Sequence, residues 1–255
     1  MKTSVGFIGG GRITKILLQA FFNRMRDFDS ISVYDPDQET LEALRVKFPV
    51  IKEAASADEI MNENLVFLAV HPPVLKNLLD KLVNTNKETI FVSLAPKISL
   101  EILSSKLGTK QVARMIPNAT SIINEGFNPI AFTENFNPYE KAELIGLLSH
   151  LGTTIETEEK NLEAYAIVSA MLPTYFWFQW EKIGELGTKM GLTPHECSLA
   201  MKSTLYSSIK LLYENKYTPA ELNDLIPVKP IGDCENSIRE CYDTKLLGLF
   251  EKIMP

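Results

Sequence analysis

The sequence predicts an α/β protein in which a doubly wound parallel sheet is followed by an all-α C-terminal domain. Short apolar runs alternate with segments of helical periodicity up to about residue 157, which is the pattern of repeated β-α-β units. The runs are apolar at consecutive positions, as in parallel strands buried on both faces. Beyond residue 157 only helical signals remain. We therefore expect one domain over residues 1–157 and a helical domain over residues 158–255.

The expected strands end in loops that are the natural place for a ligand, because ligands bind beyond the carboxyl ends of parallel strands. Strands are predicted at residues 5–8, 31–34, 65–70, 90–94, 112–116 and 153–156. The connecting helices are predicted at residues 13–21, from a Ser56-to-Glu59 capping box, after Pro73, from Ser99 to Gly108, and at residues 139–151.

The C-terminal part carries two further helix starts. Thr193 and Thr218 each precede Pro and stand three residues before Glu, which is the capping-box pattern with Pro at the first helical position. A dense aromatic cluster (Tyr175, Phe176, Trp177, Phe178 and Trp180) is expected to pack in a core or a dimer interface, or to line a substrate pocket. The stretch Glu158-Glu159-Lys160 is predicted to be a solvated connection.

Composition narrows the class of partner. The chain has 26 Lys+Arg against 32 Asp+Glu, a net charge of −6, which disfavours nucleic-acid binding. The three cysteines and three histidines are scattered, so we expect neither a metal site nor disulfides. Glycines 9–11 and Arg12 interrupt the only signal-like segment, and the apolar stretch 166–180 contains Pro173. A cytoplasmic protein without membrane contact is predicted.

A glycine-rich turn follows the first expected strand. Gly9, Gly10, Gly11, Arg12 and Ile13, with Thr14, match G-x-G-x-x-(small) between a strand and a helix. The first glycine permits the tight turn, and the second lets the backbone approach a pyrophosphate at the helix N-terminus. This context predicts a Rossmann-type dinucleotide site. The alternative is a glycine-rich turn in a protein that has lost its nucleotide.

Asp35 closes the second expected strand. A carboxylate there can accept hydrogen bonds from the adenosine ribose, and it repels a 2′-phosphate. No Lys or Arg follows closely, so the sequence favours NAD over NADP. The alternative is an Asx turn at Asp35-Pro36.

Several segments together resemble the pyrroline-5-carboxylate reductases. They are Gly6 to Gly11, Phe67 to Pro72, Ser93 to Ala95, Arg114 to Ala119 and Asn124 to Gly126. The resemblance implies reduction of a cyclic imine, pyrroline-5-carboxylate, to proline by NAD(P)H, in dimers joined through the helical domain. It also implies coenzyme contacts at Ala69, Val70, His71, Pro72, Ala95 and Asn118.

The substrate half departs from that family. Ser169 to Tyr175 replaces a Ser-Gly-Ser-Gly-Pro-Ala-Tyr segment, and Lys229 to Cys234 replaces a Ser-Pro-Gly-Gly-Thr-Thr loop that holds the substrate carboxylate. By position, the substrate pocket is expected to include Ser169, Thr174, Tyr175, Gly232 and Asp233. A negative charge at Asp233 should weaken binding of an anionic substrate.

Two residues are candidates for the chemistry. His71 is suited to donate a proton near neutral pH, or it only lines the coenzyme at a position where the family has Lys. Asn118 is suited to orient the nicotinamide carboxamide or the substrate, or it only forms a turn after Pro117. Lys97, where the family has Gly, is expected to be a surface residue.

The sequence thus predicts an NAD(P)-dependent oxidoreductase that acts on a small cyclic imine or carbonyl compound. The altered substrate segments keep a second hypothesis open, a dinucleotide-binding or sensing protein without turnover. A hydroxyacid dehydrogenase is a weaker third hypothesis, because its usual Lys-plus-Asn helix pair is missing.

Overall fold

The chain forms two compact units, which are described separately. The computed structural model describes residues 3–81, 86–214 and 216–255. Unit 1 consists of Met1–Ala170 with Phe250–Pro255, and unit 2 of Met171–Leu249. The division falls after Ala170 and not after residue 157, because Leu162 and Glu163 are buried with unit 1.

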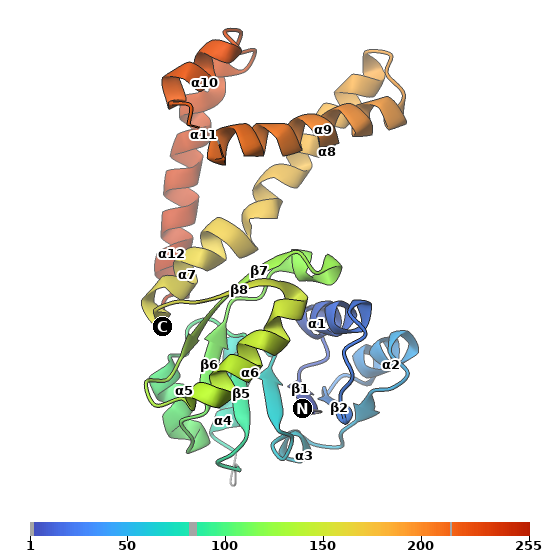
Figure 1. Ribbon diagram of the computed structural model, residues 1–255, viewed down its shortest axis with the longest axis vertical. Helices are drawn as coiled ribbons and strands as arrows, with labels where there is room; N and C mark the ends of the chain where they lie inside the picture. The colour runs from blue at the N-terminus through green and yellow to red at the C-terminus, as the bar shows by residue number, and fades with distance from the viewer. Residues whose placement is uncertain (1–2, 82–85, 215) are drawn as a thin grey trace. The chain divides into compact units, whose positions relative to one another are not determined.

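Unit 1 is built on an eight-stranded sheet (Figure 1). Its strand order is β3-β2-β1-β4-β5-β6-β7-β8, and every neighbouring pair is parallel except β6 and β7. The predicted fold class is confirmed, with one antiparallel pairing. The strands are β1 (Ser4–Ile8), β2 (Ser30–Tyr34), β3 (Lys52–Glu53), β4 (Leu65–Leu68), β5 (Ile90–Ser93), β6 (Val112–Met115), β7 (Gly126–Phe132) and β8 (Gly152–Glu156).

Helices cover both faces of the sheet because the strand residues are apolar on both sides. One face packs the central strands against α1, α2 and α6 in a single core that includes Phe7, Phe21 and Leu148. Alternation along the strands directs the intervening residues to the other face, where the buried leucines of α4 and α5 lie. The unit's helices are α1 (Arg12–Asn23), α2 (Gln38–Lys47), α3 (Ala57–Ile60), α4 (Pro72–Leu79), α5 (Leu100–Leu107), η1 (Ala119–Ile123), α6 (Pro138–Leu148), η2 (Ser149–Leu151), η3 (Glu159–Asn161), α7 (Leu162–Tyr165), the π-turn η4 (Ala166–Ala170) and, near the C-terminus, α12 (Gly248–Ile253).

Local signals predicted most of these elements. Ser99 caps α5, and Gly108 ends it with a φ of 63°. Helix α3 begins after Ser56 as expected, but the predicted capping box does not form. The Ser56 side chain makes no cap hydrogen bond, and the Glu59 carboxylate accepts from the backbone N–H of Ala55. Strand β7 was not expected, because Asn128 and Pro129 lie inside it and both residue types are depleted in strands.

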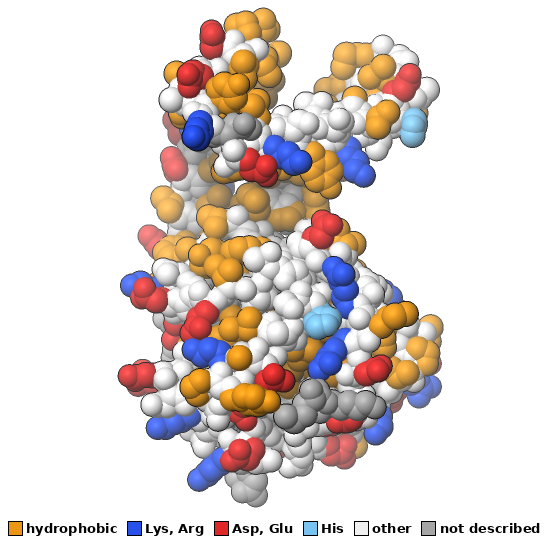
Figure 2. Space-filling view, in the orientation of Figure 1, with side chains coloured by type: hydrophobic (Ala, Val, Ile, Leu, Met, Phe, Trp, Pro, Cys, Tyr) orange, Lys and Arg blue, Asp and Glu red, His pale blue; other side chains and the backbone are white. Residues whose placement is uncertain are grey.

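Unit 2 is entirely helical and has almost no core of its own. Its elements are α8 (Leu172–Lys189), α9 (Pro194–Tyr213), α10 (Pro219–Leu225), η5 (Gly232–Cys234), α11 (Glu235–Tyr242), the π-turn η6 (Asp243–Leu247) and the first residues of α12. Among its described residues only Cys197 is buried. Figure 2 shows apolar side chains gathered over these helices. Across the described part of the chain, no helix combines the length and apolarity that crossing a membrane requires.

Both predicted capping boxes of unit 2 are confirmed at Thr193 and Thr218. Hydrogen bonds from the hydroxyl and the N–H of Thr193 hold the pKa of Glu196 below its ordinary value. This carboxylate therefore stabilises the fold above its unfolded-state pKa, and the contribution disappears as pH falls through the folded-state pKa.

Replacing Glu196 by Gln is expected to lower the melting temperature at neutral pH and to lower it less at an acidic pH below the lowered pKa of Glu196, where the wild-type carboxyl is protonated as well. Thermal melts of both proteins at the two pH values measure this. A gap of equal size at both values would contradict the assignment.

Candidate functional site

The strand order reverses between β1 and β4: the chain leaves β1 through α1 toward β2, and it leaves β4 through α4 toward β5 on the other side. On one side lie β2 and β3, and on the other β5 to β8. Open α/β sheets bind their ligands at such a switch point, beyond the carboxyl ends of the strands. The loop after β1 is the predicted glycine turn, and the loop after β4 contains Ala69, Val70 and His71.

Gly9 is required by the fold itself. Its φ is +104°, and an added Cβ would lie 2.5 Å from the carbonyl oxygen of Ala69. Its N–H donates to the carbonyl of Tyr34 at 2.8 Å. This glycine therefore lets the loops after β1 and β4 approach each other closely. Thr14, where a smaller residue is usual, is fully buried and its hydroxyl donates to the Gly9 carbonyl.

Gly11 differs from Gly9, because nothing in the chain requires a glycine there. Its φ is −71°, which any residue adopts, and an added Cβ would meet no atom within 4 Å. Gly11 is also the N-cap of α1, whose first turn has no side-chain cap and no acidic residue. The first N–H groups of α1, from Arg12 and Ile13 onward, therefore have no side-chain cap, and they lie at the positive end of the helix dipole. This arrangement fits an anionic group such as a diphosphate.

Asp35 lies beside this turn and binds backbone in two places. Its Oδ2 accepts from the N–H of Gly10 at 2.7 Å, and its Oδ1 accepts from the N–H of Asp37 at 2.9 Å. The second contact is the Asx turn that the sequence left as an alternative. Each oxygen keeps a lone pair, so the turn and a ribose contact are compatible. Asp37 then caps α2, and its hydrogen bond from Thr40 lowers the pKa of Asp37.

The loops after β4 and β5 form the next part of the same edge. Ala69 and Val70 are half-buried, Ala95 is buried, and His71 is exposed at the N-cap of α4 without capping it through its side chain. Pro72 occupies the first position of that helix. Lys97 is exposed, as expected, and has a φ of 68°, in the left-handed region that favours glycine.

Asn118 is buried and held from several sides. Its Oδ1 accepts from the N–H and hydroxyl of Thr120, its own N–H donates to Asn128, and its Nδ2 donates to Ser169 Oγ at 3.1 Å. Asn118 therefore forms the expected turn at η1 and also joins Ser169, which is 51 residues away in sequence. The structure brings together these two predicted site residues from different elements of unit 1.

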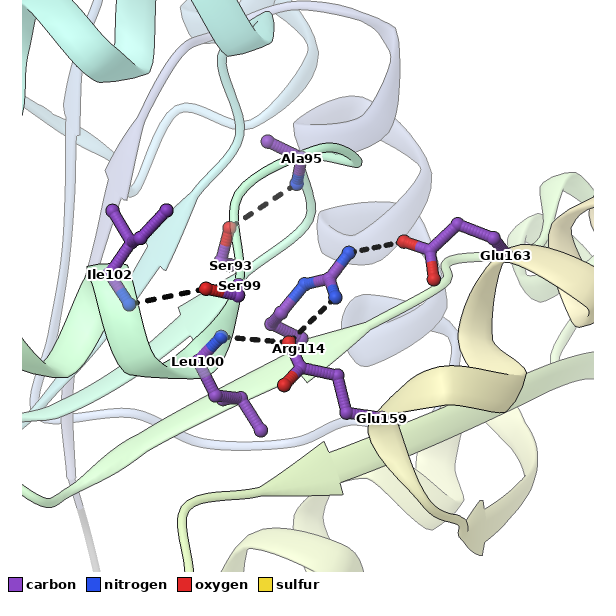
Figure 3. Close-up of polar contacts among 8 residues, drawn as sticks. All are labelled: Ser93, Ala95, Ser99, Leu100, Ile102, Arg114, Glu159 and Glu163. Carbon is purple, nitrogen blue, oxygen red and sulfur yellow. Dashed lines mark hydrogen bonds and ion pairs between the residues drawn. The ribbon is translucent and has the colours of Figure 1, made fainter. Parts of the chain in front are cut away.

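Sequence reasoning missed a buried ion cluster behind this edge (Figure 3). Arg114 of β6 is 1% exposed and pairs with Glu159 at 2.7 Å and with Glu163 at 2.5 Å. The prediction of a solvated connection at residues 158–160 holds for Glu158 and Lys160, which pair with each other at the surface, and is wrong for Glu159. A charged residue inside an otherwise apolar strand was the only available signal.

Known proteins resemble this chain over nearly its whole length. Residues 4–97 match the family model described as "NADP oxidoreductase coenzyme F420-dependent". The pyrroline-5-carboxylate reductase of Staphylococcus aureus strain COL is 24% identical over 140 residues, which are 55% of this chain and 51% of that enzyme. The chain thus spans about half the length of this curated relative. The Corynebacterium melassecola enzyme of the same name is 22% identical over 97% of this chain and 93% of its own.

A solved structure extends the likeness to the whole fold. The Plasmodium falciparum pyrroline carboxylate reductase with NADP bound has a TM-score of 0.79 at 18% identity, over 98% of this chain and 95% of that one. This chain is similar to the pyrroline-5-carboxylate reductases in sequence and in fold. The glycine turn, the β4 loop and Asn118, on which the expected resemblance was based, follow the carboxyl ends of β1, β4 and β6.

The other predicted substrate residues, Thr174, Tyr175, Gly232 and Asp233, lie in unit 2. A hollow of about 530 Å³ is lined by Thr174 and Tyr175 of α8 together with Cys234, Cys241 and Tyr242. Burial raises the pKa of Tyr175, and the nearby Tyr242 raises it further by charge repulsion. Gly232 and Asp233 lie in η5 next to Cys234 but outside the hollow. The two segments that depart from the family thus meet at one place.

Proposed function

We propose that this chain is an NAD(P)H-dependent reductase of a small imine or carbonyl compound. The observation that carries the proposal is the uncapped N-terminus of α1 beside Gly11, at the switch point of the sheet. A helix N-terminus that can bind an anion, beside a glycine that the fold itself does not require, fits the diphosphate of a dinucleotide. The likeness to pyrroline-5-carboxylate reductases over the whole fold supports the same function.

Each candidate residue then has a defined task. The nicotinamide coenzyme supplies the hydride. The diphosphate is held by the turn of Gly9, Gly10, Gly11, Arg12 and Ile13. The nicotinamide end of the coenzyme is lined by Ala69, Val70, Pro72 and Ala95. Asn118 presents an amide already fixed by Thr120 and Ser169, which suits it to orient a carboxamide. His71 is exposed at this edge, and we assign it the role of proton donor to the atom that becomes basic.

The first substrate to test is 1-pyrroline-5-carboxylate, the compound in the name of the relatives. Asp233 argues for a substrate without a carboxylate, because like charges repel. A panel of cyclic imines, oxo acids and simple ketones covers these classes. The alternative, coenzyme binding without turnover, is supported by the same departures at residues 169–175 and 229–234.

A thermal-shift screen followed by an absorbance assay tests the proposal. NADH or NADPH at 100 times its dissociation constant is expected to stabilise the fold by about 2.7 kcal/mol. Consumption of reduced coenzyme with one member of the panel is then expected. A melting curve that no coenzyme moves would refute the whole proposal, whereas binding without consumption would favour the non-catalytic alternative.

We further propose a preference for NAD over NADP, based on Asp35 and on the acidic residues that follow it, Asp37 and Glu39. Replacing Asp35 by Ser is expected to weaken NADH binding and to raise the NADPH-to-NADH affinity ratio about tenfold, because a repelling carboxylate is removed. Titrations of both coenzymes measure the ratio. Glu42→Gln, on the exposed side of α2, is the control. An unchanged ratio would remove Asp35 from the ribose site.

The proposed partner is a second copy of the chain, joined through unit 2. Trp177 and Phe178 are 53% and 64% exposed, and most other large apolar side chains of the unit's described residues are exposed as well. A helical unit with one buried residue cannot offset the entropy of its own folding.

The free cysteines at positions 197, 234 and 241 fit the reducing environment of the cytoplasm, where we expect the protein to act.

Replacing Trp177 by Glu is expected to shift the protein from dimer to monomer in light scattering at micromolar concentration, since a charge in an apolar interface is strongly unfavourable. Val46→Glu is the matched control, because Val46 is 74% exposed on unit 1. A wild-type protein that is monomeric at every concentration would refute the proposed dimer.

A further inference from the structure

The ion cluster of Arg114, Glu159 and Glu163 links three segments that are distant in sequence. The Arg114 guanidinium binds Glu159 Oε1 with one amino group and Glu163 Oε1 with the other. Glu159 Oε1 also accepts from the backbone N–H of Leu100 at 2.7 Å. One carboxylate oxygen therefore joins the first residue of α5, the strand β6 and the segment that precedes α7 (Figure 3).

Each of these segments leads to the edge of the sheet where the proposed coenzyme site lies. The loop Ala95–Ser99 runs from β5 into α5 and contains Lys97 in its left-handed conformation. Arg114 stands four residues before Asn118 on the segment that leaves β6. Glu163 begins the stretch that ends at Ser169, whose hydroxyl accepts from the Asn118 amide. β6 and the 163–169 stretch are therefore tied at two points, Arg114 to Glu163 and Asn118 to Ser169.

The chemistry of the cluster suits positioning. Glu163 is fully buried, Arg114 is 1% exposed, and the two carboxylates outnumber the single guanidinium. Apolar side chains of similar volume often stabilise a fold as well as a buried ion pair does. A guanidinium, unlike an apolar side chain, donates hydrogen bonds only in the fixed directions of its N–H groups. It therefore prevents the 159–169 segment from sliding along β6.

We propose that Arg114, Glu159 and Glu163 are positioning residues, which hold Asn118 and the loop after β5 in register at the nicotinamide end of the site. The inference rests on the proposed coenzyme site for its functional meaning. Its structural content, the coupling of Glu163 to Asn118 through two contacts, does not depend on a ligand.

Hydrogen exchange on the full-length protein tests the structural content. Glu163→Gln keeps the side-chain volume and an acceptor but removes the charge, and it is expected to speed exchange about tenfold at residues 116–123 and 98–102. Ser169→Ala removes only the link to Asn118 and is expected to speed exchange at 116–123 alone. Glu156→Gln breaks a surface ion pair with Lys141 and is the control, expected to change neither region.

Uniformly faster exchange in Glu163→Gln, or no change at residues 116–123, would overturn the proposal in favour of a purely stabilising cluster. If Glu163→Gln does not fold, Ser169→Ala alone decides, because unchanged exchange at 116–123 would refute the coupling to Asn118.

Steady-state kinetics tests the functional meaning. Glu163→Gln is expected to lower kcat about tenfold or more, since a small misplacement of an orienting group is costly, while the KM for the coenzyme changes less than about threefold because the diphosphate site at α1 is untouched. A larger effect on KM than on kcat would overturn it. A wild-type protein that binds no coenzyme would refute the proposed function, and the exchange data would still decide the positioning claim.

Discussion

Replacing Arg114 by Met is expected to lower the free energy of unfolding by about 3–5 kcal/mol. Arg114 is the partner of Glu163, which is fully buried, and of Glu159, whose side chain is 30% exposed. Removing the guanidinium leaves an uncompensated carboxylate inside the protein, and that penalty exceeds the net contribution of the pair itself. Urea denaturation of the wild type and the variant measures the difference.

Two further variants make this prediction specific. Lys106→Met breaks an exposed pair with Asp80 and is expected to cost about 0–1 kcal/mol. The double variant Arg114→Met/Glu163→Leu removes both buried charges, and it is expected to recover most of the lost stability. It is not expected to recover kcat if the cluster positions Asn118. A loss below about 1 kcal/mol for Arg114→Met alone would show that the buried charge is compensated by other groups.

Replacing Gly11 by Ala is expected to weaken coenzyme binding at least tenfold while changing stability by less than about 1 kcal/mol. The added Cβ meets no atom of the chain within 4 Å, so the folded protein accommodates it. It would occupy the space in which the diphosphate approaches the first turn of α1. Thermal shifts with and without NADH separate the two effects.

Gly9→Ala is the opposite case within the same turn. Its φ of +104° and a Cβ 2.5 Å from the Ala69 carbonyl are expected to cost about 1–3 kcal/mol of stability even without coenzyme. Gly146→Ala, in an exposed turn of α6 with no atom near the added Cβ, is the control and is expected to stabilise slightly. Coenzyme affinity equal to wild type in Gly11→Ala would place the diphosphate elsewhere.

The sequence alone determined the features that depend on neighbouring residues. The glycine turn after β1, the caps at Ser99, Thr193 and Thr218, and the left-handed Gly108 are all encoded within a few positions. Apolar runs in alternation with helical periodicity were sufficient for the fold class. The resemblance could be recognised in the first half of the chain because its motifs are short, occur in a fixed order and stand at strand ends.

Only the tertiary structure decided the contacts between distant segments. The pairing of Arg114 with Glu163 and of Asn118 with Ser169 joins positions about 50 residues apart, and no local periodicity reports such distances. The antiparallel strand β7 forms despite Pro129 because β6 and β8 supply partners on both sides. Local signals act through backbone torsions and nearest-neighbour hydrogen bonds, whereas a buried charge finds its counter-charge only after the sheet has brought remote segments together.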